Sequence, residues 1–350
     1  MRHHSLNLLT ASVAVALLVL LALPARELLR SAPGSVPGSL PVAASSSPAL
    51  RPDAGARRTF GVYVDPWHID EWAQDVGAAP QMAAKFEAFS RTLPLEPFLQ
   101  EASRKGLRRV MISWEPWRPV PVEQGLAVQQ LPQVGYRNGD IAGGLQDAYI
   151  RRIARTLREF PGTVWIRYAH EMNGYWYPWS HGPVAYRRAW RRVVALFRAE
   201  GARNVRFVWS VNANLFDGRA KWWRHLRAYW PGGRWVDAVG STMIDFGGKK
   251  RYTVALFERR LRELRRRFGL PVMLTEVNVA HAVRLPWLRD LRALLASAPW
   301  ISAVVWSQLP SRGKQHQTGT GDVDWDVRQD PASAALLRGI IEDGSRPPGR

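Results

Sequence analysis

Two glutamates and a dense group of aromatic residues are the side chains of this sequence best suited to chemistry. Glu171 lies in the stretch YAHEMNGYWYPWS, residues 168–180, and Glu276 lies near the end of the later run PVMLTEVN, residues 271–278. Cleavage of a glycosidic bond uses two opposed carboxyl groups, one to protonate the leaving oxygen and one to attack the sugar or activate water. Tyr and Trp rings offer apolar platforms for sugar rings and leave polar atoms for hydroxyl groups. The pair therefore favours a site for glycoside hydrolysis.

The alternative is a buried core segment in which each acid is only a structural ion-pair partner. Arg167 is close enough to Glu171 in the sequence to provide such a partner. A second glutamate at a similar position beside clustered tryptophans favours the sugar-cleaving interpretation over the structural one. The segment around Glu171 adds Arg167, Asn173 and Trp179 as candidate substrate-binding residues.

The elements that must position these residues are short apolar runs that alternate with segments of helical spacing from Phe60 onward. Such alternation predicts repeated β-α units and an α/β fold, a single (β/α)8 TIM barrel over residues 58–340. A doubly wound sheet would need a glycine-rich phosphate turn after an early strand, and the sequence contains none. The predicted strands are 60–65, a weaker one at 85–90, 108–115, 163–171, 205–212, 236–244, 271–278 and 302–309.

Polar and aromatic residues stand at the ends of these predicted strands. In a barrel of this type the active site is built at the carboxyl ends of the strands, so residues that are far apart in the sequence meet at one mouth. We therefore expect these strand-end residues to surround the two glutamates. They include Trp114, Glu115, His170, Asn212 and Trp306.

Composition narrows the possible partners. The 350-residue chain has a formal net charge of +20 and a pI of about 11.1, which points to an anionic neighbour. The arginines are spread through amphipathic segments, which favours a solvated helical exterior over a dedicated polyanion groove, and no zinc-finger or basic-plus-heptad pattern supports nucleic acid. Cysteine is absent, which excludes disulfides and thiolate metal sites. We expect a monomer with a polysaccharide substrate, no cofactor and no metal.

The amino-terminal residues predict export. Residues 1–30 begin with basic residues and contain an apolar run from about 8 to 23, typical of a signal peptide or of an uncleaved membrane anchor. Residues 31–57 form a Pro/Ala/Ser-rich linker, which we expect to be disordered. Both fates of the leader stay open, and the expected protein is secreted or anchored to the outer face of the cytoplasmic membrane. Residues 341–350 are expected to form a flexible tail.

The segment RYAHEMNGYWYPWS closely resembles the acid/base segment of glycoside hydrolase family 26, best known for β-mannanases. The resemblance runs through most of residues 60 to 310, with GVYVDPW, ISWEPW, NVRFVWSVNAN, YWPGGRWVDAVG and PVMLTEVN in family order. It implies a retaining (β/α)8 hydrolase with Glu171 on strand four as general acid/base and Glu276 on strand seven as nucleophile. It also implies that His170 binds near the sugar 2-hydroxyl. Trp176 would form the wall of a subsite, and Trp306 would be the ring at the end of the last strand.

One departure from the family pattern concerns the sixth strand. Family members usually carry a tyrosine there whose hydroxyl contacts the nucleophile, but the run VDAVGSTMIDFGG places Ile244 at that position, and Phe246 nearby has no hydroxyl. The departure puts plain mannan in doubt as the substrate. The alternatives are a β-glucan, xylan or exopolysaccharide hydrolase on the same scaffold, or a non-catalytic polysaccharide-binding or assembly factor. For catalysis we expect Glu171 to be protonated among the rings and Glu276 to be ionised beside polar neighbours such as Asn278 or Arg167.

Overall fold

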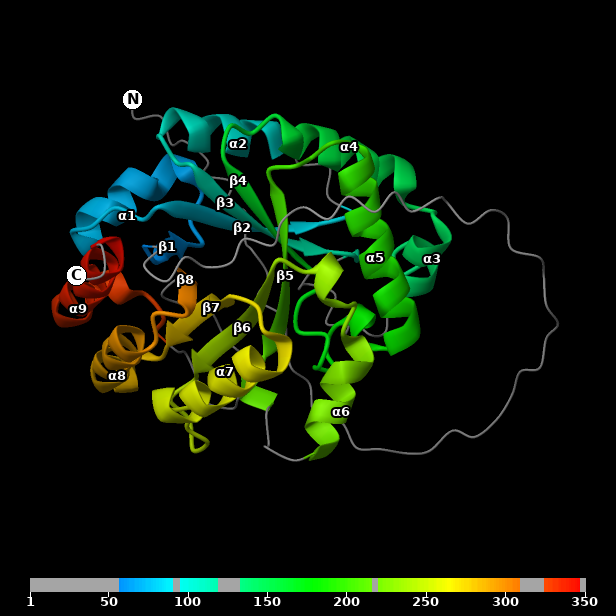
Figure 1. Cartoon of the computed structure of the whole chain (residues 1–350). Coiled ribbons are helices and arrows are strands. Elements are labelled where there is room, and N and C mark those ends of the chain that lie inside the picture. The colour runs from blue at the N-terminus through cyan, green and yellow to red at the C-terminus, as the bar shows by residue number, and fades with distance from the viewer. Residues whose placement is uncertain (1–56, 91–94, 119–132, 216–219, 309–323, 347–350) are drawn as a thin grey trace, which may run out of the picture.

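Eight parallel strands close into a barrel in chain order, with the last strand paired to the first (Figure 1). The computed structural model describes residues 57–90, 95–118, 133–215, 220–308 and 324–346. The predicted (β/α)8 TIM barrel is confirmed, and a strand lies at each of the predicted places. The strands are β1 (Thr59–Val62), β2 (Met82–Ala88), β3 (Arg109–Glu115), β4 (Thr163–Tyr168), β5 (Val205–Asn212), β6 (Ala238–Asp245), β7 (Val272–Val279) and β8 (Ile301–Trp306).

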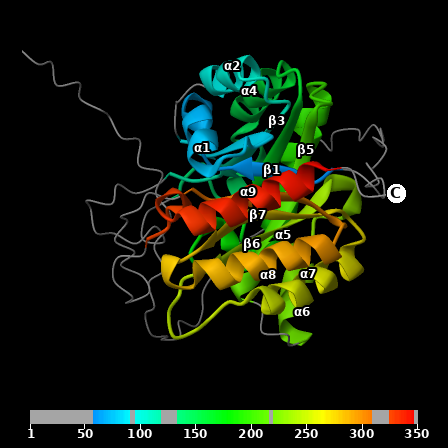
Figure 2. The same ribbon diagram turned by 90° about the vertical axis from the view of Figure 1, so that its left-hand side faces the viewer.

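Helices cover the outside of the barrel between the strands, and Figure 2 shows α7, α8 and α9 side by side on one flank, in yellow, orange and red. The helices are α1 (Ile69–Val76), α2 (Leu95–Arg104), α3 (Asn138–Gly143), α4 (Asp147–Arg158), α5 (Pro183–Ala199), α6 (Ala220–Tyr229), α7 (Val254–Phe268), α8 (Arg284–Ser297) and α9 (Pro331–Ser345). The described strands and helices lie between Thr59 and Ser345 and share one large hydrophobic core.

Helix α7 illustrates how the sequence sets these elements. Thr253 caps its amino terminus by accepting a hydrogen bond from the Leu256 amide, and Gly269 ends it with φ of +66°. Phe257, Leu261 and Leu264 recur at helical spacing and are fully buried against the sheet. The opposite face is solvated and carries the other arginines of the segment LFERRLRELRRRFG, whereas Arg260 is buried and donates to the Ala213 carbonyl.

The barrel interior changes from apolar to polar along the strands. Its apolar part is a small cluster that includes Met82, Met111, Val208 and Met273, whereas the much larger cluster lies between the sheet and the helices. Toward the carboxyl ends of the strands, inward positions carry hydroxyl groups and one arginine. This change of lining places the polar functional groups at one end of the barrel.

The chain termini differ in part from the expectation. Helix α9 continues to Ser345, because Ile340, Ile341 and Gly344 are buried against the rest of the fold, so residues 341–345 of the expected tail 341–350 are helical. The expected leader 1–30 and all but the last residue of the expected linker 31–57 lie outside the described residues. Within the described ranges, every helix is too short or too polar to traverse a lipid bilayer.

Candidate active site

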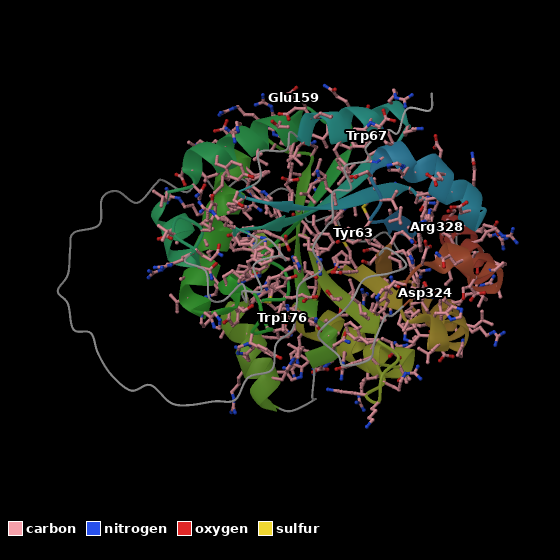
Figure 3. All side chains as sticks on the ribbon, turned by 180° about the vertical axis from the view of Figure 1, so that it is seen from behind. Tyr63, Trp67, Glu159, Trp176, Asp324 and Arg328 are labelled. Atoms are coloured by element: carbon pink, nitrogen blue, oxygen red, sulfur yellow. The ribbon has the colours of Figure 1, made fainter. Side chains whose placement is uncertain are left out.

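The centre of the site is Arg167, an inward residue of β4 whose side chain is fully buried. Its Nε donates to Ser210 Oγ at 3.1 Å, its Nη1 to Ser113 Oγ at 3.2 Å, and its Nη2 to Thr242 Oγ1 at 2.7 Å. The Tyr63 hydroxyl lies 3.5 Å from Nη1 and shares a hydrogen bond of 2.8 Å with Ser113. Neutral hydroxyls from four other strand ends therefore hold the guanidinium without neutralising it. Figure 3 shows Tyr63 close to the middle of the barrel.

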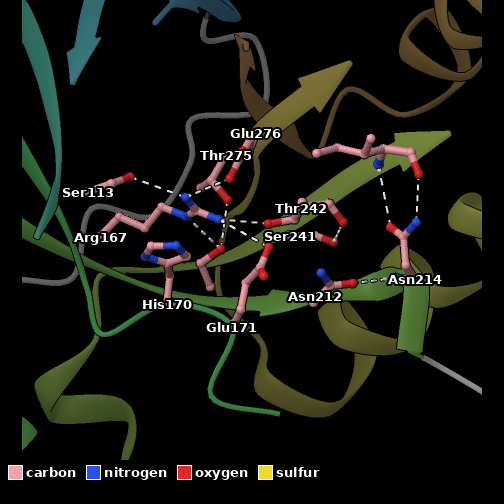
Figure 4. Close-up of polar contacts among 12 residues, drawn as sticks. Ser113, Arg167, His170, Glu171, Asn212, Asn214, Ser241, Thr242, Thr275 and Glu276 are labelled. Atoms are coloured by element: carbon pink, nitrogen blue, oxygen red, sulfur yellow. Dashed lines mark hydrogen bonds and ion pairs between the residues drawn. The ribbon is translucent and has the colours of Figure 1, made fainter. Parts of the chain in front are cut away.

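Both candidate catalytic glutamates contact this guanidinium (Figure 4). Glu276 Oε2 lies 2.9 Å from Arg167 Nη1, and Glu171 Oε1 lies 3.7 Å from Arg167 Nη2. The Glu171 side chain is 8% exposed and that of Glu276 is 14% exposed. The structure thus brings the two carboxylates together at the carboxyl ends of strands four and seven, as predicted, and links them through one fixed cation.

Burial raises the pKa of Glu276 to about 7, against the opposing effect of the Arg167 charge and with a further increase from Glu171. We expected polar neighbours such as Asn278 or Arg167 to keep Glu276 ionised. The side-chain amide of Asn278 donates to the Ser307 carbonyl instead. Although burial alone lowers the pKa of Arg167, the surrounding acidic groups raise it above its usual value, and the guanidinium stays charged.

The backbone around Glu171 has an unusual conformation. Ala169 and Glu171 have φ of +43° and +55°, in the left-handed region that residues with a Cβ rarely occupy. The amide of Glu171 donates to the Ser210 carbonyl at 2.8 Å, and that of Ala169 donates to the Trp114 carbonyl at 3.0 Å. These bonds fix the turn that ends β4 at Tyr168, three residues before the predicted end at 171. Strain of this kind typically clusters at functional sites.

An indole ring covers Glu171. Trp176 Nε1 donates to Glu171 Oε2 at 3.2 Å, and the ring itself is buried. Gly174 makes this contact possible, because a Cβ at that position would lie 2.7 Å from the six-membered ring of Trp176. The structure thus places Trp176 beside the acid, as expected for the wall of a sugar subsite.

His170 is fully buried behind this wall. Its Nε2 shares a hydrogen bond of 3.0 Å with the Tyr177 hydroxyl, and its carbonyl accepts from Trp179 Nε1 at 2.7 Å. Burial and the charge of Arg167 hold the pKa of His170 well below its usual value, so the ring is neutral. Glu115 completes the group, with Oε1 3.9 Å from His170 Nε2 and Oε2 accepting from Trp117 Nε1 at 3.2 Å. His170, Glu115 and Trp179 therefore form a buried group beside Glu171 that holds the loop after β4 in position.

Two asparagines connect the loop after β4 to the end of β5. Asn173 donates to the Asn212 carbonyl and accepts from the Asn212 amide, each at 2.8 Å. A third, Asn214, donates to the Ile244 carbonyl at 2.6 Å and accepts from its amide at 3.4 Å. The predicted binding residues Asn173 and Asn212 thus lie at the mouth and fix the position of the loop that carries Glu171.

Two predicted substrate-binding tryptophans do not face the mouth. Trp114 packs against Phe89, with ring centroids 4.4 Å apart, in the layer between sheet and helices. Trp306 belongs to the same layer and is fully buried, while Val305 before it points into the barrel. Side chains alternate along a strand, so Glu115 faces inward and its neighbour Trp114 faces outward.

The sequence interpretation assigned no role to the hydroxyl groups that hold Arg167 or to the rings of Trp67 and Tyr175. Trp67 follows β1 and is 51% exposed, and Tyr175 follows β4 and is 45% exposed. Thr275 supports the hydroxyl group of Ser210 through a shared hydrogen bond of 2.7 Å. The hydroxyl residues that contact Arg167 are Tyr63, Ser113, Ser210 and Thr242.

The site of the family departure is apolar. Ile244 and Phe246 are half-buried and pack with Ala280 and Trp325, with the Phe246 and Trp325 ring centroids 5.6 Å apart. The Tyr63 hydroxyl approaches the catalytic pair from β1 instead and donates to the Thr275 carbonyl at 3.1 Å. Burial raises the pKa of Tyr63 to about 12, so this hydroxyl keeps its proton.

In the part of the chain that the structure describes, no three His, Asp or Glu side chains lie close enough together to hold a metal ion.

Comparison with known proteins finds one family model and two curated relatives that match parts of this chain. The family model of glycosyl hydrolase family 26 matches residues 125–259, which contain Glu171 but not Glu276. Endoglucanase H of Acetivibrio thermocellus is 27% identical over 255 residues, which cover 68% of this chain and 25% of that protein. The β-1,3-xylanase TXYA of a Vibrio species is 33% identical over 103 residues, 29% of this chain and 21% of that protein. The chain thus spans about a quarter of the length of the curated relatives it matches, or less.

Solved structures show the same fold. A family 26 β-mannanase from Bacteroides ovatus superimposes with a TM-score of 0.58 over 83% of this chain and 89% of that one, at 18% sequence identity. At this identity the likeness concerns the fold alone.

Proposed function

Because the chain belongs to glycosyl hydrolase family 26, a family of glycosidases, we propose that it is a retaining enzyme that cleaves internal β-linkages of a polysaccharide. The observation that carries the proposal is the contact of two carboxylates from strand ends four and seven with one buried guanidinium. A binding-only groove has no need of such a pair. The family relationship and the pair together favour hydrolysis over the alternative of a non-catalytic binding factor.

In the proposed reaction Glu276 attacks the anomeric carbon while Glu171 protonates the leaving oxygen, which gives a covalent glycosyl-enzyme. Glu171 then removes a proton from water, and that water releases the sugar from Glu276. Arg167 lies closer to Glu276 than to Glu171, and its charge favours the ionised form of the nucleophile against the effect of burial.

For the substrate, we place a β-linked glucan or xylan before mannan. The sequence relatives are named an endoglucanase and a β-1,3-xylanase, whereas the mannanase structures share the fold. Ile244 also lacks the hydroxyl group that a tyrosine at this position usually places beside the nucleophile in family members. The exposed rings of Trp67 and Tyr175 are candidate platforms for sugar units beyond the cleavage point.

For localisation, we propose export followed by secretion or by anchoring at the outer face of the cytoplasmic membrane. The support is the sequence alone, with a basic start, the apolar run at 8–23 and the linker at 31–57. Fractionation of the producing cells, with sequencing of the amino terminus of the recovered protein, distinguishes a cut leader from a retained anchor. Recovery from the cytoplasm would contradict the proposal.

The enzyme proposal is tested by counting reducing ends released from β-glucans, xylans, mannans and acidic exopolysaccharides. Turnover of one glycan is expected with wild type and is expected to fall at least 1000-fold, on the order of the loss of an essential catalytic group, in Glu171→Ala and in Glu276→Ala. Azide should restore turnover of an aryl glycoside by Glu276→Ala and give the product of opposite anomeric configuration. Binding unaffected by either substitution, with no new reducing ends, would support the non-catalytic alternative.

A further inference from the structure

Five arginines that act on one another by charge lie on the outside of the barrel, two of them over the Trp235 ring. We call them the arginine patch: Arg187, Arg191, Arg198, Arg206 and Arg234. Three of them belong to α5, one lies near the start of β5, and one lies in the turn Gly233–Trp235 before β6. Helices α5 and α6 lie side by side here (Figure 1).

Neutral groups hold the guanidinium groups of the patch in place. Arg198 and Arg234 lie over the Trp235 ring, with their Cζ atoms 5.3 Å and 5.0 Å from its centroid. Arg198 also donates to the Arg234 carbonyl at 2.7 Å, and Arg191 donates to the Pro231 carbonyl at 2.8 Å. A planar guanidinium that is stacked on a ring keeps a fixed orientation, and its remaining N–H groups can bind phosphate in a bidentate manner.

Carboxylates do not neutralise this patch. None of its five arginines forms an ion pair with a described residue, whereas Arg192 on the same helix pairs with Asp147 at 2.6 Å. The acidic residue that acts on Arg198 is Asp237, which raises the pKa of that arginine. Its carboxylate accepts a hydrogen bond from the Phe207 amide.

The arginines of the patch lie close enough together for their charges to lower one another's pKa. Burial and then the neighbouring charges of Arg187 and Arg234 lower the pKa of Arg191. Burial lowers the pKa of Arg198 as well, and Arg206 and Arg234 add to that effect while Asp237 opposes it. Arginines that only solubilise a surface have no reason to gather at a cost in repulsion, and the folded protein keeps them together.

Three arginines of the patch lie toward the end of the barrel opposite the catalytic pair, whereas Arg187 and Arg191 lie earlier in α5. Arg198 is next to the last residue of α5, Arg206 is the second residue of β5, and Arg234 precedes β6, all on the side where the strands begin. The chain also enters the barrel on that side, because β1 starts at Thr59. The residues before it include the linker 31–57 and the apolar run 8–23.

We propose that the arginine patch docks on an anionic phospholipid surface. Its fixed guanidinium groups bind lipid phosphates, and the mouth of the barrel then faces away from the membrane toward the polysaccharide. A basic patch adds electrostatic attraction to anionic lipids to the hold that the apolar run provides. The inference depends on export to a membrane surface but not on catalysis, so it fails or holds independently of the hydrolase proposal.

The test uses residues 57–350, which contain the whole barrel and lack the apolar run. Sedimentation with phosphatidylcholine vesicles is compared with sedimentation with vesicles that also contain phosphatidylglycerol. We expect binding only to the anionic vesicles and weaker binding at high salt. The triple variant Arg191→Gln/Arg198→Gln/Arg234→Gln should bind about 100-fold more weakly, because each arginine near an anionic surface contributes about fivefold.

The matched control is Lys249→Gln/Lys250→Gln/Arg289→Gln, which makes the same change in net charge at exposed positions near the mouth and on α8. It should bind like wild type. An equal loss in both triples, or no preference for phosphatidylglycerol, would overturn the proposal. Stronger capture by an acidic polysaccharide or by DNA would overturn it in favour of that polymer. Because Arg198 packs on Trp235, the single variant Arg191→Gln and melting curves separate lost docking from lost folding.

Discussion

Replacement of Arg167 by methionine is the perturbation that tests the electrostatics of the site most sharply. The change removes the one cation that both glutamates contact and keeps a side chain of similar length. An opposite charge at such a distance lowers the pKa of a carboxyl group by about 1–3 units. Without it, the pKa of Glu276 should rise above its present value of about 7 by a similar amount.

The expected result is a shift of the acidic limb of the pH profile. A nucleophile must be ionised, so kcat/KM at neutral pH should fall about 10- to 1000-fold, and the acidic limb should move upward by about 1–3 pH units. Arg167→Lys keeps the charge but loses the planar contacts to Ser210 and Thr242, so its limb should move less. The measurement is kcat/KM against pH for the three proteins.

The reasoning would be refuted by an Arg167→Met enzyme that loses activity equally at every pH. That outcome would mean that the arginine only supports the fold. Removal of one partner from a buried ion pair typically destabilises a protein by about 3–5 kcal/mol, so melting curves must accompany the kinetics. Ser113→Ala, which removes one hydroxyl contact of the guanidinium and keeps its charge, is the control for loss of order without loss of charge.

Three further predictions concern the same site. Because the folded-state pKa of Glu276 is raised from 4.5 to about 7, the contribution of Glu276 to stability is fully present below about pH 4.5 and falls by up to about 3 kcal/mol as pH rises through 7. Urea unfolding of Glu276→Gln should lack this fall. Glu171→Gly should be more stable than Glu171→Ala by about 1 kcal/mol because φ at this position is +55°; calorimetry showing the alanine variant to be the more stable would contradict the strain. Ile244→Tyr should raise the ratio of kcat/KM on mannan to that on β-glucan, and an unchanged ratio would mean that the position does not select the substrate.

The barrel was predictable because each strand is a short apolar run of nearly the right length. The two glutamates were predictable because a barrel brings the ends of strands four and seven to the same mouth. The direction in which neighbouring side chains point was harder to predict. Trp114 and Glu115 are adjacent, and only the register of β3 decides that the carboxylate points inward and the ring outward.

The arrangement around Arg167 could not be predicted from local patterns. It depends on hydroxyl groups at the same level of the barrel in separate strands. Gly240 leaves space for them, because a Cβ at that position would lie 2.7 Å from Thr275 and 2.8 Å from Ser210. The raised pKa of Glu276 depends on burial and on distances between strands, which a sequence does not contain. The positive φ of Glu171 likewise results from tertiary hydrogen bonds rather than from a glycine in the sequence.

The most direct test of the two-glutamate account is a proton NMR record of the first product released from the glycan that the enzyme turns over. The account predicts that the new reducing end appears first as the β-anomer and converts to the equilibrium mixture afterwards, because two displacements at one carbon retain its configuration. First appearance of the α-anomer would contradict the assignment of Glu276 as the nucleophile.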